Sequence, residues 1–313
     1  MPRRLTYTLI FDYLVYLLVV LTENFLNIVP ESWARAFGRF LGRVGWLVLP
    51  DRRNAVIENL TIAFGKEKSQ QWIRKTAIKS FEHLGLLVVE FFLIRRWTQK
   101  DMAERIKIQG KHDYDLALLP GNHGICLLTS HFGCFEVSAA TCRFLGIKTN
   151  LFATGLKNPF LTRYLFTRAG KDASIRTFPH KGAVKSLLEI LTNGELVAML
   201  GDQRGDAERG IFVNFFGSPA PANEIFARLA IDTKARILPI CTYRLDNGNY
   251  LTTLGPDIEF EPTGDRKNDL ITLSQKYHDL FEKWLRINPE QGFWFQRKWR
   301  RKPSSRRRRR KSS

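Results

Sequence analysis

The chain from residue 124 onward alternates short apolar runs with longer segments in which apolar residues recur at helical spacing. The short runs predict strands that are buried on both faces, and the longer segments predict helices. The predicted strands are residues 124–129, 147–154, 175–178, 196–200, 237–243 and, after a hairpin turn at Asn247-Gly248, 250–254. The predicted helices are residues 134–144, 159–169, 181–192 and 224–231. This alternation indicates an α/β fold with a predominantly parallel central sheet flanked by helices.

Helical periodicity also dominates the first hundred residues, at 32–49, 52–64 and 70–94. In the first of these segments, Trp33, Phe37 and Phe40 are interleaved with arginines. That pattern suits either a helix lying in a membrane interface or an ordinary core-facing helix. The third segment ends in an apolar run at 88–94, which favours packing in the core over lining a tunnel.

Residues 5–22 form an apolar and aromatic segment that contains Asp12 and falls short of the ~20 residues of a clean membrane span. Arg3 and Arg4 precede it, as in a signal peptide. No small-residue cleavage site follows near Thr22, which favours a retained anchor helix over a cleaved signal. More arginines follow the segment than precede it, so the positive-inside bias places the rest of the chain in the cytoplasm.

The formal net charge of +19 over 313 residues is unevenly spread. Eleven Lys or Arg and no acidic residue lie between Arg297 and Lys311, and the rest of the chain is still basic. Such a surface suits anionic lipid headgroups, phosphorylated glycolipids or an acidic protein partner. With 44% hydrophobic residues, the chain can bury the core of one large domain. We expect a hydrophobic N-terminal membrane anchor at 1–22, a single domain at 23–303 and a basic disordered tail at 304–313.

The cysteines and all but one of the histidines lack partners at a spacing typical of a metal or catalytic site. The cysteines form no Cys-x-x-Cys pair, so we expect buried thiols in a reducing compartment and no metal. They are Cys126, Cys134, Cys142 and Cys241. The histidines for which we expect no role are His83, His112, His123, His180 and His278.

His131 differs from the other histidines because a carboxylate, Glu136, follows it across a sharp turn. His131 leaves the predicted strand at 124–129, and Glu136 falls in the first turn of the next helix. The helix dipole favours the charged carboxylate there, and that carboxylate can bind one imidazole nitrogen while the other accepts a proton. The pair therefore predicts a general base directed at a hydroxyl group. Structural histidines also occur at this spacing, so the interpretation depends on the motifs downstream.

Further motifs follow His131 along the chain. They are Asn158-Pro159, the segment from His180 to Glu189, Gly201-Asp-Gln203, Phe215-Phe-Gly217 with Pro219-Ala220, and Pro289-Glu-Gln291 followed by Trp294 and Arg297. In this order and spacing they resemble the lipid A biosynthesis acyltransferases, the secondary lauroyl and myristoyl transferases within the lysophospholipid acyltransferase group. The resemblance extends over residues 5–303, nearly the whole chain.

The resemblance implies a glycerolipid acyltransferase-like fold and a membrane-bound O-acyltransferase on the cytoplasmic face of the bacterial inner membrane. Such an enzyme moves a fatty acyl chain from acyl carrier protein, or alternatively from coenzyme A, to a hydroxyl of a lipid A precursor or related glycolipid. His131 would be the general base, oriented by Glu136, with no covalent acyl-enzyme and no cofactor. The oxyanion would need donors, either backbone N–H groups near Gly133 or a nearby cation. The expected partners are acyl carrier protein, the glycolipid acceptor and anionic membrane lipids.

The resemblance also implies which residues bind the substrate. Asp202 and Gln203 match the family's Asp-Gln pair, and their place after a buried strand favours the site over a solvated turn. Arg204 and Arg209 beside them either meet lipid phosphates or are simply solvated. The Phe-Phe-Gly motif is expected to shape the pocket wall. The full set of expected substrate-binding residues is Asp202, Gln203, Arg204, Arg163, Phe216 and Gly217.

The chain departs from the family pattern at two positions. Relatives usually carry Arg five residues before the Pro of the Asn-Pro pair, where this chain has Thr154, and Arg163 or Arg168 would compensate. Gln296 stands where relatives tend to have His, two residues after Trp294. Both departures leave room for a second hypothesis, in which the acceptor is another polar lipid such as a lysophospholipid, an aminolipid or a mannosylated inositol lipid.

The arginine run at 306–310 raises a third alternative, a nucleic-acid-binding protein, since arginines bind phosphate backbones nonspecifically. The sequence contains no recognisable nucleic-acid module, so we expect no specific nucleic-acid partner. A tail flanked by serines is more simply a disordered cytoplasmic arm that lies on anionic lipid.

Overall fold

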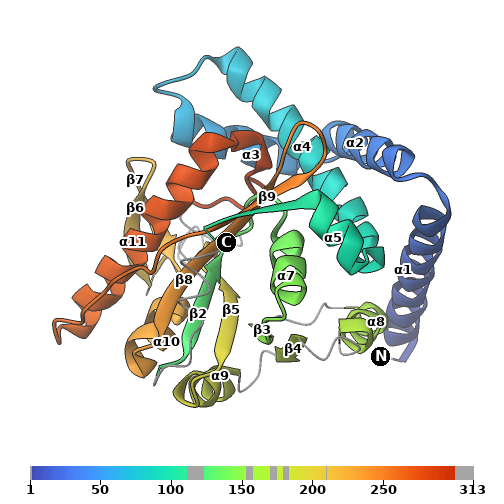
Figure 1. Cartoon of the computed structure of the whole chain (residues 1–313). Helices are drawn as coiled ribbons and strands as arrows, with labels where there is room; N and C mark the ends of the chain where they lie inside the picture. The colour runs from blue at the N-terminus through green and yellow to red at the C-terminus, as the bar shows by residue number, and fades with distance from the viewer. Residues whose placement is uncertain are drawn as a thin grey trace.

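The computed structural model describes residues 2–110, 123–152, 158–169, 175–178, 183–208 and 210–299. Within these residues a seven-stranded sheet has the order β1-β9-β8-β2-β5-β3-β4 (Figure 1). Neighbouring strands in it are parallel except β8 and β9. The strands are β1 (Ile106–Gln109), β2 (Ile125–Thr129), β3 (Thr149–Phe152), β4 (Ile175–Phe178), β5 (Leu196–Leu200), β8 (Arg236–Arg244) and β9 (Tyr250–Leu254). The expectation of a predominantly parallel α/β fold is confirmed.

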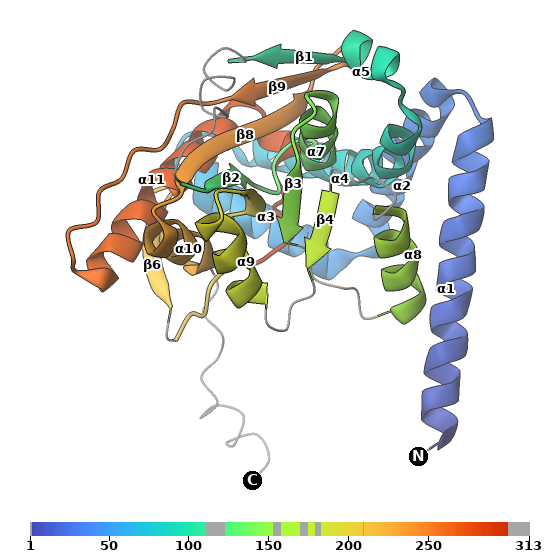
Figure 2. The same cartoon turned by 60° about the horizontal axis from the view of Figure 1, so that its bottom comes forward.

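Helices cover both faces of this sheet (Figure 2). Successive side chains of β2 alternate between two cores, as strand geometry requires. Cys126 and Leu128 join a large core with α3, α4, α9, α10 and α11, whereas Ile125 and Leu127 face a smaller one with α7. The helices are α1 (Pro2–Ile28), α2 (Glu31–Val48), α3 (Pro50–Phe64), α4 (Gln70–Leu93), α5 (Gln99–Arg105), α7 (Phe135–Phe144), α8 (Pro159–Ala169), α9 (Ala183–Thr192), α10 (Ile225–Thr233) and α11 (Arg266–Ile287), with short 3₁₀ turns at Ile94–Arg96 and Pro289–Gln291.

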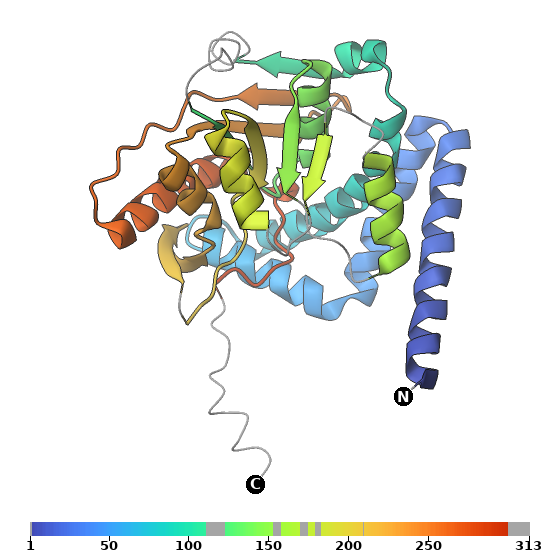
Figure 3. The same cartoon turned by 90° about the horizontal axis from the view of Figure 1, so that it is seen from below.

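The first helix, α1, runs along the outside of the domain beside α8 (Figure 3). Its C-terminal part is fixed by Leu26, which is fully buried against α2 and α4. Its middle is fixed to α8, because Asn158 Nδ2 donates to the carbonyl of Asp12 at 2.7 Å and Tyr16 packs edge-on against Tyr164. The helix is longer than the apolar segment at 5–22, and it docks on the domain through polar as well as apolar contacts.

The second helix, α2, has the core-facing side that one of its two sequence-based alternatives requires. It packs on α4 through small residues, among them Ala34 and Gly42, and so has a core-facing side. On the other side, the aromatic rings of Trp33 and Phe40 are 72% and 60% exposed. In α4, the apolar run at 88–94 is mostly buried, which confirms its expected place in the core.

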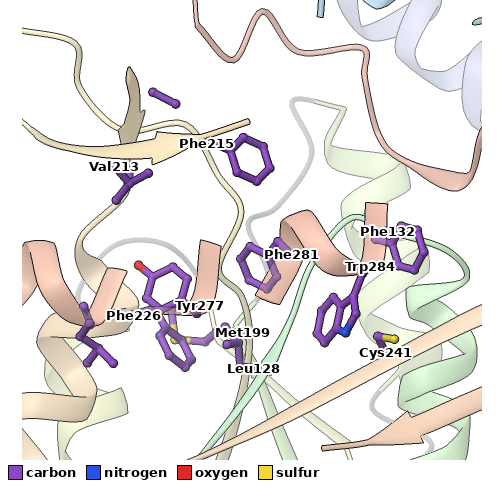
Figure 4. Close-up of a cluster of buried hydrophobic side chains, with 14 of the residues drawn as sticks. Leu128, Phe132, Met199, Val213, Phe215, Phe226, Cys241, Tyr277, Phe281 and Trp284 are labelled. Atoms are coloured by element: carbon purple, nitrogen blue, oxygen red, sulfur yellow. The ribbon is translucent and has the colours of Figure 1, made fainter. Parts of the chain in front are cut away.

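Besides the short 3₁₀ turns, five of the described elements do not correspond to any sequence prediction: α5, β1, α11 and the two strands of an antiparallel hairpin, β6 (Ile211–Phe215) and β7 (Ser218–Ala222). Strand β7 reads Ser-Pro-Ala-Pro-Ala, and prolines argue against a strand unless it lies outside a central sheet, as this hairpin does. Helix α11 crosses the large core. Its Tyr277 and Phe281 lie near Leu128 and Met199 of the central sheet, and its Trp284 lies near Cys241 of β8 (Figure 4).

Candidate active site

Strand register brings His131 and Asp202 together. Thr129, the last residue of β2, pairs with Leu200, the last residue of β5, in a parallel ladder. His131 and Asp202 each follow two residues later, so both leave the same edge of the sheet side by side. His131 Nδ1 lies 2.9 Å from Asp202 Oδ1, and the His131 backbone N–H donates to Asp202 Oδ2 at 3.0 Å. One carboxylate therefore holds both the ring and the main chain of His131.

This pairing fixes the tautomer of His131. A carboxylate only accepts hydrogen bonds, so Nδ1 donates and, in the neutral ring, Nε2 carries the lone pair. Nε2 makes no hydrogen bond with any other residue in the described part of the chain. Burial alone would lower the pKa of His131, but the charge and hydrogen bond of Asp202 raise it above its usual value. The same contacts hold the pKa of Asp202 low although burial opposes this. The arrangement is that of a general base.

Glu136 lies in the first turn of α7, as predicted, but it is not the residue that binds the imidazole nitrogen. Among the described residues it makes no hydrogen bond with His131, whose Nδ1 is held by Asp202 instead. Burial raises the pKa of Glu136, and the charges of Arg95 and His131 oppose that shift. The two side chains thus interact through charge. Glu136 was the predicted partner because it is close to His131 along the chain, whereas Asp202 reaches His131 through strand register.

The turn after His131 depends on Gly133, which has a φ of +61°. A Cβ atom at this position would lie 2.0 Å from the carbonyl oxygen of Thr242. The Gly133 N–H donates to Gln291 O at 2.8 Å, and the Cys134 N–H donates to Thr242 O at 2.7 Å. These N–H groups, which the sequence suggested as oxyanion donors, therefore already have acceptors within the protein.

The side chain of Gln291 explains the Pro-Glu-Gln motif as a structural clamp. Its amide exchanges two hydrogen bonds with the backbone of Arg244 at the end of β8, at 2.9 and 2.8 Å. The backbone carbonyl of Gln291 accepts a hydrogen bond from the Gly133 N–H. One residue thus joins the turn after His131 to the end of β8. The Asn-Pro motif is likewise structural, since Asn158 Oδ1 accepts from Leu161 N at the start of α8.

A pocket of about 50 Å³ opens beside His131. Ligand pockets for whole small molecules usually measure ~300–1,000 Å³, so this one is too small to hold an acyl chain. Its apolar wall is Phe132, Phe215, Phe281, Leu285, Phe293, Trp294 and Trp299. Its polar groups are Asn59, Ser130, His131, Asp202, Gln296 and Lys298.

Sequence reasoning missed several of these residues. Lys298 belongs to a basic run that indicated only surface charge, although its Nζ donates to the carbonyl of Asp202 at 2.6 Å. Asn59 sits on α3 and donates to the carbonyl of Trp294 at 2.6 Å, which holds the C-terminal segment over the pocket. No local motif signals either residue, because both depend on contacts between distant parts of the chain.

The other expected substrate-binding residues lie outside the pocket lining. Gln203 is exposed and lines a separate small pocket near α10, and Arg204 forms a β-bridge with Ala222. Phe216 and Gly217 form the turn of the β6–β7 hairpin, with φ angles of +51° and +70°. Within the Phe-Phe-Gly motif, it is the preceding Phe215 that reaches the pocket.

Arg163 is exposed on α8, away from the pocket lining. Other residues considered from the sequence lie outside the described residues or side chains, so nothing places them in or out of the site. They are Thr154, Arg209, the side chain of Arg168 and the basic tail at 304–313.

A histidine at the carboxyl ends of parallel strands, held by a carboxylate on the neighbouring strand, is an arrangement suited to an α/β enzyme that activates a hydroxyl group. The model of the bacterial lipid A biosynthesis acyltransferase family matches residues 1–301. The chain therefore belongs to this family and is an acyltransferase.

The chain aligns with named relatives over most of its own length and most of theirs. The chain is 23% identical to the lipid A biosynthesis palmitoleoyltransferase of Escherichia coli over 271 residues, which is 84% of this chain and 85% of the relative. It is 24% identical to the lipid A biosynthesis lauroyltransferase of the same organism over 277 residues, 88% of each chain. The resemblance noted from the motifs is confirmed.

Proposed function

We propose that this acyltransferase moves a fatty acyl chain from an acyl carrier protein thioester to a hydroxyl of a lipid A precursor or related glycolipid, with His131 as general base. The observation that supports this most is the contact between His131 Nδ1 and Asp202, which leaves the lone pair of Nε2 free to accept a proton. Relatives named as palmitoleoyl and lauroyl transferases of lipid A biosynthesis support the acceptor class.

The proposed reaction is a direct transfer. The acceptor hydroxyl oxygen attacks the thioester carbonyl carbon while His131 Nε2 takes the hydroxyl proton. The carbonyl electron pair moves to oxygen and forms a tetrahedral oxyanion. When that pair returns, the C–S bond breaks and the leaving thiolate takes the proton from Nε2. Asp202 stabilises the imidazolium between these steps, and the Glu136 carboxylate adds to that stabilisation through charge.

The proposed donor is acyl carrier protein, with acyl-CoA as the alternative and no other cofactor. The carrier's charge complements this chain, because a net charge of +19 attracts an acidic partner over about a Debye length. A thioester on either carrier would present the same carbonyl to His131. The donor is therefore distinguished by comparing KM for the two thioesters with the purified enzyme.

We place the enzyme at the cytoplasmic face of the bacterial inner membrane. By length and composition alone, α1 could cross a membrane, since the segment Leu9–Ile28 has a mean hydropathy of 1.8 and few buried residues. The exposed aromatic rings of Trp33 and Phe40 and the basic surface suit anionic lipid. We assign the anchor to 1–22, the acyltransferase domain to 23–303 and a membrane-contacting tail to 304–313.

A specific observation favours a second candidate acceptor. Gln296, which stands where relatives tend to have His, is part of the pocket lining. A changed group next to the reacting atoms fits an acceptor other than a conventional lipid A precursor, such as a lysophospholipid, an aminolipid or a mannosylated inositol lipid.

Mass spectrometry of total lipids tests both candidates. Cells with the wild-type protein, with His131→Ala and without the protein are compared. Loss of one acyl mass from lipid A in the last two strains supports the first proposal. Loss of an acyl mass from a phospholipid or aminolipid with lipid A unchanged supports the second. An unchanged lipid profile in all three strains contradicts both.

A further inference from the structure

Lys298 lies in the same pocket as His131 and has no task in the mechanism above. Its side chain is buried, with 8% exposed, and it lines the pocket. Its Nζ donates to the carbonyl oxygen of Asp202 at 2.6 Å and lies over the ring of Phe215. His131 binds the side chain of Asp202 and Lys298 binds its main chain. The base and the cation are therefore held by the same residue.

The neighbouring His278 helps to orient the ammonium group. His278 Nδ1 lies 2.8 Å from the carbonyl oxygen of Ser274, which can only accept, so Nδ1 carries the hydrogen. Burial lowers the pKa of His278 to about 3, so the ring is neutral and Nε2 has a free lone pair. Lys298 Nζ lies 3.4 Å from that nitrogen. Two of the three ammonium N–H groups are thus occupied, and the third has no protein acceptor among the described residues.

The backbone N–H groups near His131 already have hydrogen-bond acceptors within the protein. The N–H groups of Gly133 and Cys134 bind backbone carbonyls, and the N–H of His131 binds Asp202. Among the described residues that line the pocket, Lys298 is the one Lys or Arg. The hydroxyl of Ser130 and the side-chain amide of Gln296 are the rival donors, but both are neutral and meet a developing negative charge less strongly than an ammonium group does.

The charges in the pocket also balance through the reaction. Before proton transfer, the negative charge of the Asp202 carboxylate interacts with the positive charge of Lys298. After His131 takes the hydroxyl proton, an imidazolium is added together with the oxyanion. The groups that line the pocket then carry two positive and two negative charges, so proton transfer adds no net charge to the lining.

We propose that Lys298 is a catalytic residue whose remaining N–H binds the thioester oxygen as it becomes the oxyanion. This inference rests on the proposed acyl transfer. As the acceptor oxygen attacks, the C=O electron pair moves onto the oxygen next to Lys298, and the acceptor proton moves to His131 Nε2. As the oxyanion collapses, the C=O bond reforms, the C–S bond breaks and the thiolate takes the proton from Nε2. Lys298 keeps its own proton throughout and acts by charge and hydrogen bonding.

This role predicts a bell-shaped pH profile of kcat. The rising limb reports His131 becoming neutral. Burial lowers the pKa of Lys298 to about 8, so the ammonium form, and with it the rate, declines as pH rises through that value. Lys298→Arg keeps a positive charge that does not titrate in this range, so its falling limb should disappear.

Purified full-length enzyme and a defined acyl thioester donor test the proposal. Lys298→Met should lower the maximal kcat by ~10²–10³, the scale for losing one oxyanion donor, with KM for the thioester nearly unchanged. The matched control is Lys283→Met, an exposed lysine on α11 outside the pocket lining, which should keep both the rate and the falling limb. Ser130→Ala should cost less than Lys298→Met.

Three results overturn the proposal. The first is a wild-type maximal kcat in Lys298→Met. The second is a Lys298→Met profile in which only the rising limb moves along the pH axis, and the third is a larger loss of kcat in Ser130→Ala than in Lys298→Met. The second of these would make Lys298 a positioning residue for Asp202. Should Lys298→Met not fold, Lys298→Arg decides, because a falling limb that persists near pH 8 excludes Lys298 as its source. If the wild-type protein itself transfers no acyl group, the proposed function fails before this inference is reached.

Discussion

One carboxylate, that of Asp202, accepts hydrogen bonds from both the ring and the backbone of His131. Because each carboxylate oxygen has its own donor, the ring cannot turn without losing a bond. Asp202 therefore fixes both the tautomer and the direction of the base. Glu136 acts on the same ring only through charge.

This division of roles predicts different costs for removing the two charges. Asp202→Asn should lower kcat by ~10²–10⁴, because the neutral amide neither fixes the tautomer nor stabilises the imidazolium. Glu136→Gln should cost less. Both rates are measured with the same thioester and compared with His131→Ala, after melting curves show that each variant is folded. A larger loss in Glu136→Gln would make Glu136 the orienting residue after all.

The pH dependence of kcat/KM gives a second test. A general base must be unprotonated, so activity rises with pH through the pKa of His131 in the free enzyme. Asp202 raises that pKa, which places the rising limb above the ordinary histidine value of ~6.5. In Asp202→Asn the remaining effect of burial lowers the pKa, so the limb should move to lower pH. A limb that stays in place would show that the titrating group is not His131.

A third prediction concerns the turn that follows His131. Gly133→Ala combines a positive φ with a Cβ 2.0 Å from the backbone of Thr242, and that backbone cannot yield without moving β8. We expect loss of the folded protein or of nearly all activity. Gly146→Ala is the matched control, since its φ is +72° but its Cβ meets nothing within 4 Å. This variant should lose only ~1 kcal/mol of stability and should keep the wild-type activity. Equal melting temperatures for the two variants would contradict the crowding at Gly133.

The sequence predicted most of the sheet because each buried strand carries its own apolar run, as in residues 124–129 and 196–200. It predicted α7 and the position of His131 for the same local reason. It could not predict that Asp202 would bind His131, since that depends on which strands are neighbours and in which register. The partner closest along the chain, Glu136, was therefore favoured.

Lys298 and the β6–β7 hairpin were missed for a different reason. In each case the local sequence predicts a different structure. Lys298 lies in a basic run typical of a solvated surface, and Pro219 and Pro221 interrupt a strand pattern. Tertiary contacts overrule both signals. Lys298 is buried by packing over the pocket, and the hairpin tolerates prolines because it lies outside the main sheet.

A fourth prediction concerns the buried ion pair behind the catalytic turn. Arg244 donates to the Glu90 carboxylate and also contacts His83, whose ring nitrogen Nε2 lies 3.2 Å from Gly133 O. Arg244→Met leaves Glu90 buried without its main partner, which should cost ~3–5 kcal/mol of stability. The control is Arg43→Met, which breaks an exposed pair with Glu82 and should cost ~0–1 kcal/mol.

The sign of the pH effect separates this pair from ordinary packing. Burial alone would raise the pKa of Glu90, but Arg244 holds it below its usual value. Glu90 thus stabilises the wild-type fold above the unfolded-state pKa of ~4.3, and that stability is lost as pH falls through the folded-state pKa. In Arg244→Met, burial is no longer opposed by Arg244 and raises the pKa of Glu90. The loss of stability relative to the wild type should therefore be larger at pH 7 than at pH 4. A penalty that does not change with pH would indicate lost packing and not an unpaired charge.

The last prediction concerns the membrane. Deleting residues 1–22 removes the exposed apolar side chains of α1, such as Phe11 and Leu18, but keeps the buried Leu26 that docks the helix. Vesicle binding should weaken without disappearing, because Trp33 and Phe40 and the basic surface remain. High salt should then release the truncated protein, since charge supplies much of the remaining attraction.

Adding Trp33→Ser and Phe40→Ser to the truncation should weaken binding further and should abolish it for neutral vesicles, to which the basic surface is not attracted. The matched control adds Ile287→Ser, which removes an equally exposed apolar side chain from α11 and should leave binding unchanged. Co-sedimentation with anionic and neutral vesicles measures all forms. Clean release of the full-length protein by salt alone would contradict the apolar anchor, and equal binding of the two substituted truncations would remove α2 from the membrane contact.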